Sequence, residues 1–413
     1  VTLNTNGNLI LASNATATAS VADMTANGLY SGNRITGDVT VERYIANHPK
    51  SWRFLSVPTF GQTIKNAWME GNQPLSNSTN PGYGTIITSN LTGATTTLGF
   101  DIYTPSGATM KTFNPNTANW ESVPSAYSII ANNKGYMLFI RGDRSVTAFN
   151  QAPTATTLRT TGTLYTPIDN PPASLNVQSD KFESVGNPYA SALDFSKIGK
   201  SGGIQDVFYT WDPDLTTSQN SAYGYGGYQT IVRDGNGYIV IPGGGSYSNG
   251  NVSIKSGQAF FVRAIGTEGQ ISFSETAKSE GNEQASRLSS EMPLIKLNFS
   301  VLSSGNPVLL DGVISQFDSA YAAGVDVNDI LKIGNSTSEN IGIMRDTKRL
   351  TMERRPSIET TDTIFYNLGS IKRLSYQFEI SAQNFGANQY NAFLYDKYTL
   401  ASTAINLNSS TLI

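Results

Sequence analysis

The chain has 413 residues and a formal net charge of -3, and only 14% of its residues are charged, against roughly 25% in ordinary soluble domains. This length allows about three domains with cores of their own, while so few charges exclude a basic face for nucleic acid. Cysteine is absent, which excludes disulfide scaffolds, thiolate metal sites and cysteine nucleophiles.

Short apolar runs between Asn, Gly and Pro turns predict strands throughout the first 155 residues. Residues 1–33 form an N-terminal strand segment, and residues 34–155 form a first β repeat. One stretch, Thr63–Glu70, predicts a short helix because Ile64, Ala67 and Trp68 have the spacing of a single apolar stripe. The expected strands of this part are Leu9–Leu11, Val39–Val41, Trp52–Val57, Thr85–Ile87, Gly99–Tyr103 and Tyr136–Ile140.

Three motifs of this region occur a second time, in the same order. Their offsets of 125, 128 and 122 residues indicate two copies of a domain-sized unit and not a solenoid of short repeats. We therefore expect a second β repeat at residues 156–276, with both copies folded as β-sandwich or jelly-roll-like domains. The matching pairs are Arg34–Val39 with Arg159–Leu164, Phe54–Val57 with Phe182–Val185, and Gly135–Arg141 with Gly257–Arg263.

The last part of the chain has a different pattern. Residues 277–292 are polar with alternating charges, which predicts a linker. Residues 293–413 alternate apolar and polar positions over short strands, which predicts an immunoglobulin-like β-sandwich. The chain ends six residues after the last of these strands, which indicates an artificial boundary, a processing site or a fold that lacks its final strand. In the last case a strand of another chain can complete the open sheet edge. The expected strands are Leu294–Phe299, Val308–Ile314, Leu350–Arg354, Thr363–Tyr366, Tyr376–Ile380, Ala392–Tyr395 and Thr403–Leu407.

The composition also bears on location. No apolar run reaches the roughly 18 residues of a membrane-spanning helix, and the N-terminus lacks the basic and apolar segments of a signal peptide. We expect either that a leader has been removed or that the chain is a fragment. Asn, Ser, Thr, Gly and Tyr must cover most of the surface, which is typical of secreted and cell-surface β-proteins.

Few residues are arranged for catalysis or metal binding. His48 is the only histidine, so zinc sites built from several histidines are excluded, and an exposed loop position explains it best. Asp212 with Asp214, and Asp326 with Asp329, are candidates to hold a structural Ca²⁺ ion, but capping and turn roles explain them better. No other cofactor is expected. The 31 acidic residues leave open the carboxylate pair of a polysaccharide hydrolase, although nothing in the sequence marks one.

The segment from Ser221 to Tyr228 is the strongest candidate for ligand binding. Tyr223, Tyr225 and Tyr228 stand on a Gly-rich stretch, where flat rings with a polar edge suit stacking on sugars or contact with protein. A loop that packs on its own domain is the alternative. The segment therefore supports a glycan-binding module as one functional hypothesis.

Six short stretches, in this order along the chain, carry a family resemblance: Thr36–Ile45, Trp52–Pro58, Gly135–Arg144, Val185–Tyr189, Ser256–Val262 and Thr361–Ile364. With these motifs the chain resembles the C-terminal region of large surface proteins of Bacteroidota that are exported by the type IX secretion system, including gliding adhesin-like and filament-like proteins. The resemblance implies an extracellular or cell-surface location in a Gram-negative bacterium and no catalytic residues. It also implies that Ser319 and Thr363, each in an Asp-Ser/Thr-apolar triplet, are O-glycan acceptors.

These observations favour a non-enzymatic surface protein with a structural or adhesive role, such as a component of a fibre or filament. Its expected partners are other surface proteins, copies of itself and glycans. A glycan-binding module is the first alternative, and a polysaccharide hydrolase is the second.

Overall fold

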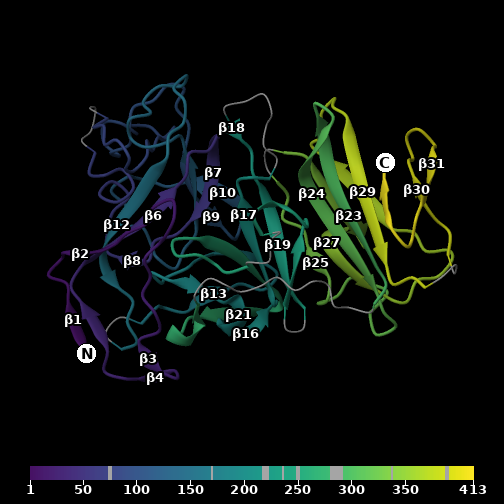
Figure 1. The fold of residues 1–413 in the computed structure, drawn as a ribbon, viewed down its shortest axis with the longest axis horizontal. Helices are drawn as coiled ribbons and strands as arrows, with labels where there is room; N and C mark the ends of the chain where they lie inside the picture. Colours follow the sequence, from purple (N-terminus) through teal and green to yellow (C-terminus); the bar gives the residue numbers. More distant parts are fainter. Residues whose placement is uncertain are drawn as a thin grey trace. The chain divides into compact units, whose positions relative to one another are not determined.

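The computed structural model describes residues 1–72, 77–168, 171–215, 223–234, 237–247, 252–279, 292–335, 338–386 and 390–413. Within these ranges the regular elements are strands and three short 3-10 helices, so the predicted all-β class is confirmed. Figure 1 shows these strands in sequence colours. The chain divides into two compact units, of which unit 1 is Val1–Trp211, Asn220–Gly224 and Asn251–Gln284, and unit 2 is Asp212–Gln219, Tyr225–Gly250 and Ala285–Ile413.

Unit 1 contains the first predicted repeat and most of the second, whose residues 212–219 and 225–250 belong instead to unit 2. Its 3-10 helices are η1 (Phe195–Lys197) and η3 (Glu275–Ala277), and the last residue of its strand β17 belongs to unit 2. Its strands are β1 (Thr2–Asn4), β2 (Leu9–Leu11), β3 (Thr25–Ala26), β4 (Leu29–Tyr30), β5 (Arg34–Thr36), β6 (Val39–Ile45), β7 (Lys50–Leu55), β8 (Thr59–Phe60), β9 (Met110–Asn114), β10 (Asn119–Ser122), β11 (Tyr136–Ile140), β12 (Thr156–Leu164), β13 (Leu175–Val177), β14 (Phe182–Gly186), β15 (Ala192–Leu193), β16 (Gly199–Ile204), β17 (Val207–Asp212), β18 (Tyr223–Gly224), β21 (Ala259–Ser272) and β22 (Lys278–Ser279).

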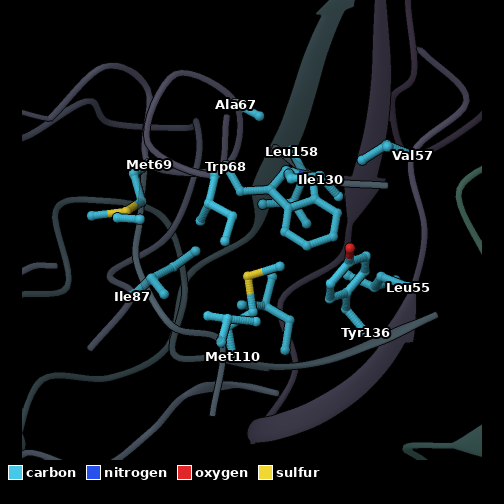
Figure 2. Close-up of a cluster of buried hydrophobic side chains, with 14 of the residues drawn as sticks. Leu55, Val57, Ala67, Trp68, Met69, Ile87, Met110, Ile130, Tyr136 and Leu158 are labelled. Atoms are coloured by element: carbon cyan, nitrogen blue, oxygen red, sulfur yellow. The ribbon is translucent and has the colours of Figure 1, made fainter. Parts of the chain in front are cut away.

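A sheet with the strand order β10-β9-β11-β7-β18 covers the core of the first repeat. Alternate residues of β11, among them Tyr136 and Leu138, face this core together with Leu55 of β7. Figure 2 shows Leu55 and Tyr136 beside Trp68, whose ring meets the Tyr136 ring edge-on at 6.5 Å. Both strands are buried at most of their positions, as expected for the short apolar runs that predicted them.

The repeated motifs form the same strand pairs in both copies. In each copy the strand with the Phe-x-Ser-Val motif pairs antiparallel with the strand of the third motif, Gly135–Arg141 or Gly257–Arg263. These pairs are β7 with β11 and β14 with β21. The register differs, since Trp52 pairs with Phe139 while Ser184 pairs with Phe261. β6 of the first copy pairs antiparallel with β12, the first strand of the second copy. The expected boundary between residues 155 and 156 therefore falls inside one compact unit, immediately before a strand that joins the copies.

Equivalent residues of the two copies also form reciprocal contacts. The Ser56 amide donates a hydrogen bond to the Gly257 carbonyl oxygen at 2.9 Å, and the Ser184 hydroxyl donates to the Gly135 carbonyl oxygen at 3.1 Å. Each motif serine thus contacts the motif glycine of the other copy. A Cβ on Gly186 would lie 2.6 Å from the Asn132 carbonyl oxygen, so the backbones approach too closely there for any side chain.

Three local predictions in the first repeat are wrong. Residues 64–71 form turns and not a helix. Their backbone hydrogen bonds do not keep the constant four-residue separation of an α-helix, and Glu70 has a φ of 53°. Ile64, Ala67 and Trp68 are nevertheless buried as predicted. Thr85–Ile87 and Gly99–Tyr103 form no strand. Both stretches are buried except at Ile102, along an irregular backbone that side chains stabilise.

The Arg144 and Asp101 side chains organise this irregular region. Both side chains are fully buried, and Arg144 Nη2 lies 2.8 Å from Asp101 Oδ1. Arg144 also donates to the carbonyl oxygens of Ser78 and Thr85, at 2.9 and 3.0 Å. Asp101 accepts a further bond from the Ile87 amide at 2.8 Å. Side-chain hydrogen bonds therefore satisfy backbone groups that a strand ladder would otherwise pair.

The predicted linker at residues 277–292 falls largely outside the described residues. Its first residues are ordered, because Lys278–Ser279 forms β22 and pairs with β15. Lys278 Nζ lies 2.7 Å from Glu275 Oε2, and both side chains are buried. Glu275 also accepts a hydrogen bond from the Met24 amide at 3.0 Å, which fixes the N-terminal segment to the second repeat.

Unit 2 begins with one hairpin and continues with the C-terminal strands. Its 3-10 helix is η2 (Gly245–Tyr247). Its strands are β19 (Gly227–Asp234), β20 (Gly237–Ile241), β23 (Leu294–Ser303), β24 (Asn306–Phe317), β25 (Ile330–Leu331), β26 (Asn340–Arg345), β27 (Lys348–Arg355), β28 (Phe365–Gly369), β29 (Tyr376–Gln383), β30 (Ala392–Tyr395), β31 (Ser402–Ile405) and β32 (Ser410–Leu412).

One large sheet encloses the main core of unit 2. Its strand order is β28-β26-β27-β24-β23-β29-β32, with β25 paired to β27, and its strands are in agreement with the predicted β-sandwich. Leu297, Phe299 and Ile380 are at the centre of the core. The hairpin of β30 and β31 forms a separate two-stranded sheet, and its residues Leu394 and Ile405 pack against the same core. The opposite face of this hairpin is left outside.

Candidate interaction surface

The Tyr-rich segment offers less ring surface than its sequence suggests. The side chain of Tyr223 lies outside the described part of the structure. Tyr228 is buried in β19 with 6% of its surface exposed, and its amide donates to Asn335 Oδ1 at 2.8 Å. Tyr225 is half-buried, and the Lys372 ammonium lies 5.0 Å from its ring centroid. The structure therefore leaves no open face on Tyr228 for a sugar to stack on.

Asp212 and Asp214, the first predicted Ca²⁺ pair, converge on one serine. Asp212 is fully buried, and its two oxygens accept hydrogen bonds from the Ser246 amide and hydroxyl at 2.6 and 2.7 Å. Asp214 accepts from the same hydroxyl at 3.1 Å. Burial raises the pKa of the Asp212 carboxyl, despite these hydrogen bonds. The pair joins the end of β17 to η2.

Asp326 and Asp329, the second predicted pair, form a turn. Asp329 Oδ2 accepts from the Asp326 amide at 2.9 Å, and Asp329 Oδ1 accepts from the Arg354 amide at 2.9 Å. Asp326 in turn accepts from the Asn328 amide at 2.8 Å. Among the residues that the structure describes, no group of three or more His, Asp or Glu side chains is placed to hold a metal ion.

His48 lies beside Ser51, which raises the question of a catalytic pair. His48 Nδ1 is 2.7 Å from the Pro49 carbonyl oxygen and 3.2 Å from the Ser51 hydroxyl. A carbonyl oxygen only accepts, so the short contact requires that Nδ1 carry the proton. That nitrogen is then unable to act as a base toward Ser51.

Both expected O-glycan acceptors are exposed. Ser319 lies in a turn after β24, and Thr363 precedes β28. The position of Thr363 corrects the expected strand Thr363–Tyr366, since the strand begins only at Phe365. Arg355 explains the late start, because it donates to the Thr363 carbonyl oxygen at 3.2 Å and pairs with Asp362 at 3.1 Å.

The outer face of the β30–β31 hairpin carries several large apolar side chains that are exposed. Phe393 and Tyr395 point away from the core and are 62% and 53% exposed, while Leu394 between them faces inward. Phe393 pairs across the hairpin with Ala404. An exposed apolar group of this kind, which the core does not use, is typical of an interaction site. We call the exposed residues Phe393, Tyr395, Tyr398 and Leu400 the aromatic face.

The turn of the hairpin holds the aromatic face in a fixed conformation. Asp396 accepts hydrogen bonds from the Thr399 hydroxyl at 2.6 Å and the Tyr398 amide at 2.8 Å, and these bonds lower the pKa of its carboxyl. Its amide donates to the Ala401 carbonyl oxygen at 2.9 Å. Tyr398 is 95% exposed at the tip of this turn. A rigid turn presents the ring with little entropy left to lose on binding.

A hollow of about 180 Å³ adjoins the aromatic face. Its walls come from the start of β30, the end of β31 and the segments that precede and follow these strands. Tyr390 is fixed in one wall, since its hydroxyl donates to the Ile358 carbonyl oxygen at 3.1 Å. The lining residues are Gly386, Tyr390, Asn391, Ala392, Phe393, Ala404, Ile405, Asn406, Leu407 and Asn408.

Both strands of the hairpin were predicted from the sequence, but the exposed aromatic face that they carry was not. Ala392–Tyr395 is apolar at every position, so a strand there must show an apolar residue on both faces. That was the available signal, because a strand with one solvated face ordinarily alternates apolar and polar residues.

Comparison with known proteins identifies a family. In the described residues no helix is long and apolar enough to cross a membrane. No curated protein and no solved structure matches the chain. A family model described as a domain of unknown function, DUF8693, matches residues 1–411, which include both compact units. The chain therefore belongs to the DUF8693 family.

Proposed function

We propose that this chain is a non-enzymatic, secreted cell-surface protein of a Gram-negative bacterium, with a structural or adhesive role such as a component of a fibre. The aromatic face is the observation that carries this proposal. Its rings are exposed on a fixed hairpin, and Leu394 and Ile405 on the other face already provide the packing. Contact with another molecule is the role that explains apolar rings in this position.

The rest of the chain supports a mechanical role. Two copies of one motif set are joined by the β6–β12 pairing and by the reciprocal contacts of Ser56 and Ser184. Strand pairing between distant parts of the chain resists separation, because many hydrogen bonds must break together. The resemblance to exported Bacteroidota surface proteins agrees with a cell-surface location.

Location is tested on intact cells that produce the chain. We expect added protease to degrade the protein while a cytoplasmic marker survives. A protein that stays intact until the cells are lysed would refute the surface location.

Adhesion is tested with beads coated with the full chain. We expect the combined variant Phe393→Ala, Tyr395→Ala, Tyr398→Ala to reduce bead attachment to cells of the same strain at least about tenfold, because aromatic anchors contribute most of the energy at such contacts. Phe60→Ala is the matched control, since Phe60 is 58% exposed in unit 1. Equal attachment of all three proteins would contradict the adhesive role.

A further inference from the structure

We infer that the hollow beside the aromatic face binds a neutral sugar residue of a polysaccharide. This inference rests on the proposed adhesive function and names the class of molecule that the surface recognises. The size of the hollow, its amide groups and its aromatic wall indicate a sugar, and its uncharged lining indicates a neutral one.

The size of the hollow suits a small polar ligand. Its volume of about 180 Å³ is far more than the roughly 10–15 Å³ that admits one water molecule. It is also below the roughly 300–1,000 Å³ of pockets that enclose drug-sized ligands. A single ring of a longer chain, with its neighbours lying on the aromatic face, fits this shape.

Three amide side chains provide hydrogen bonds for hydroxyl groups. Asn391, Asn406 and Asn408 line the hollow. Within the described residues, the side-chain amides of Asn391 and Asn408 make no hydrogen bond to the protein. An amide both donates and accepts, as does a hydroxyl group, so each can satisfy a sugar hydroxyl in either direction.

The third amide is held in a fixed orientation. Asn406 Oδ1 accepts a hydrogen bond from the backbone N–H of Asn408 at 2.8 Å. The backbone N–H of Asn406 donates to the Thr411 hydroxyl at 2.9 Å. Within the described residues, the Asn406 side-chain nitrogen makes no hydrogen bond to the protein, so it is able to donate to a ligand in the hollow that Asn406 lines. Fixed donors lose little entropy on binding, which favours recognition of a defined hydroxyl pattern.

Aromatic rings complete the site. Phe393 and Tyr390 both line the hollow, and the Tyr390 hydroxyl donates to the Ile358 carbonyl oxygen. The rings thus offer apolar faces on which the C–H face of a pyranose can stack, with the amides around them for its edge. This combination of rings and amides is more specific for sugars than an apolar groove, which would bind apolar ligands of many kinds.

Charge separates neutral from acidic ligands. None of the described residues that line the hollow carries a charged side chain. An acidic polysaccharide or a nucleic acid would bring anions to a site without a cation to pair them, at a desolvation cost. The lining therefore favours a neutral glycan.

Affinity electrophoresis of the full chain tests the inference. The probes are dextran, mannan, xylan and galactan, each cast into a native gel, with polygalacturonate as the acidic comparator. We expect at least one neutral polysaccharide to retard the protein, and polygalacturonate not to. The variant Asn391→Ala with Asn408→Ala should weaken the retardation about tenfold or more, since two hydrogen bonds to the ligand are lost.

Two further variants keep the test decisive. Ala404→Arg adds a cation and bulk to an exposed position of the hollow, and should abolish the retardation by neutral polysaccharides. Asn90→Ala, at an exposed position of unit 1, is the matched control and should migrate like the wild type. Retardation that survives both hollow variants, retardation only by polygalacturonate, or none by any neutral polysaccharide would overturn the inference.

The two proposals fail separately. If the aromatic variants stop bead attachment while no neutral polysaccharide retards the protein, the adhesive role stands and sugar recognition falls. If a neutral polysaccharide retards the protein while the beads attach equally in all variants, sugar recognition stands and the adhesive role falls.

Discussion

The buried Arg144–Asp101 pair gives the sharpest test of how the irregular part of the first repeat is held. We expect Asp101→Asn to lower the free energy of unfolding of unit 1 by about 3–5 kcal/mol, the usual cost of removing one partner from a buried ion pair. The substitution keeps the side-chain volume but removes the charge that compensates Arg144. It also presents an amide group where carboxylate oxygens accept from Arg144, Asn72 and Ile87.

The assay follows from where tryptophan occurs. All four tryptophans, Trp52, Trp68, Trp120 and Trp211, belong to unit 1, so their fluorescence during urea unfolding reports that unit alone. With a slope of roughly 1–3 kcal/mol per molar urea, a loss of this size lowers the midpoint by at least about 1 M. Lys197→Met is the control, since the Lys197–Asp194 pair is exposed at lysine and should contribute less than about 1 kcal/mol.

A double-mutant cycle separates this pair from its surroundings. Arg144→Met should cost as much as Asp101→Asn, and the double variant should lose clearly less than the two single losses together, because both remove one shared interaction. Strictly additive losses, or an Asp101→Asn protein within about 1 kcal/mol of wild type, would refute the reasoning.

Three further predictions follow from single residues. Gly186→Ala should destabilise unit 1 by about 1–3 kcal/mol or more, because its Cβ would lie 2.6 and 2.7 Å from backbone oxygens, whereas Gly107→Ala meets no atom within 4 Å and should unfold at the wild-type urea midpoint. Burial raises the pKa of Glu353 above its ordinary 4.5, so the folded state binds the proton more tightly and unit 2 loses stability as pH rises above 4.5. Glu353→Gln should remove this loss, and hydrogen exchange of the β27 amides at pH 4 and pH 7 measures it; an unchanged pH dependence would contradict the assignment. Mass spectrometry of the chain produced in a Bacteroidota host should find glycan on Ser319 and Thr363 that Ser319→Ala and Thr363→Ala remove, and unmodified peptides would rule it out.

The fold class was predictable because short runs rich in apolar and aromatic residues, separated by turn residues, favour strands. Tyr136–Ile140 is a strand with the expected bounds, and the strand expected at Tyr376–Ile380 starts at Tyr376 and extends to Gln383. The strand pairing between β6 and β12 was not predictable, because nothing local in a sequence says which distant edge a strand meets. The repeat predicted two copies but not their interlocking.

The irregular segments failed for a different reason. Thr85–Ile87 has the composition of a strand, yet its backbone groups bond to the side chains of Arg144 and Asp101. These partners lie far along the chain, and their pairing depends on the complete fold. The same reason explains Tyr228, whose Gly-rich surroundings suggested a loop, while Asn335 and the buried strand β19 hold it inside.

The two kinds of sequence signal in this chain have different physical roles. Repeated residues such as Ser56 and Ser184 form hydrogen bonds between the two copies. A substitution there should therefore change the stability of the fold before it changes binding. The aromatic face occurs once, and Phe393 contributes no packing to the core that Leu394 helps to fill. Removing the Phe393 ring should therefore change what the protein binds while its unfolding stays within about 0.5 kcal/mol of wild type. A residue that function retains and folding does not need is where the specific activity of this chain should be sought.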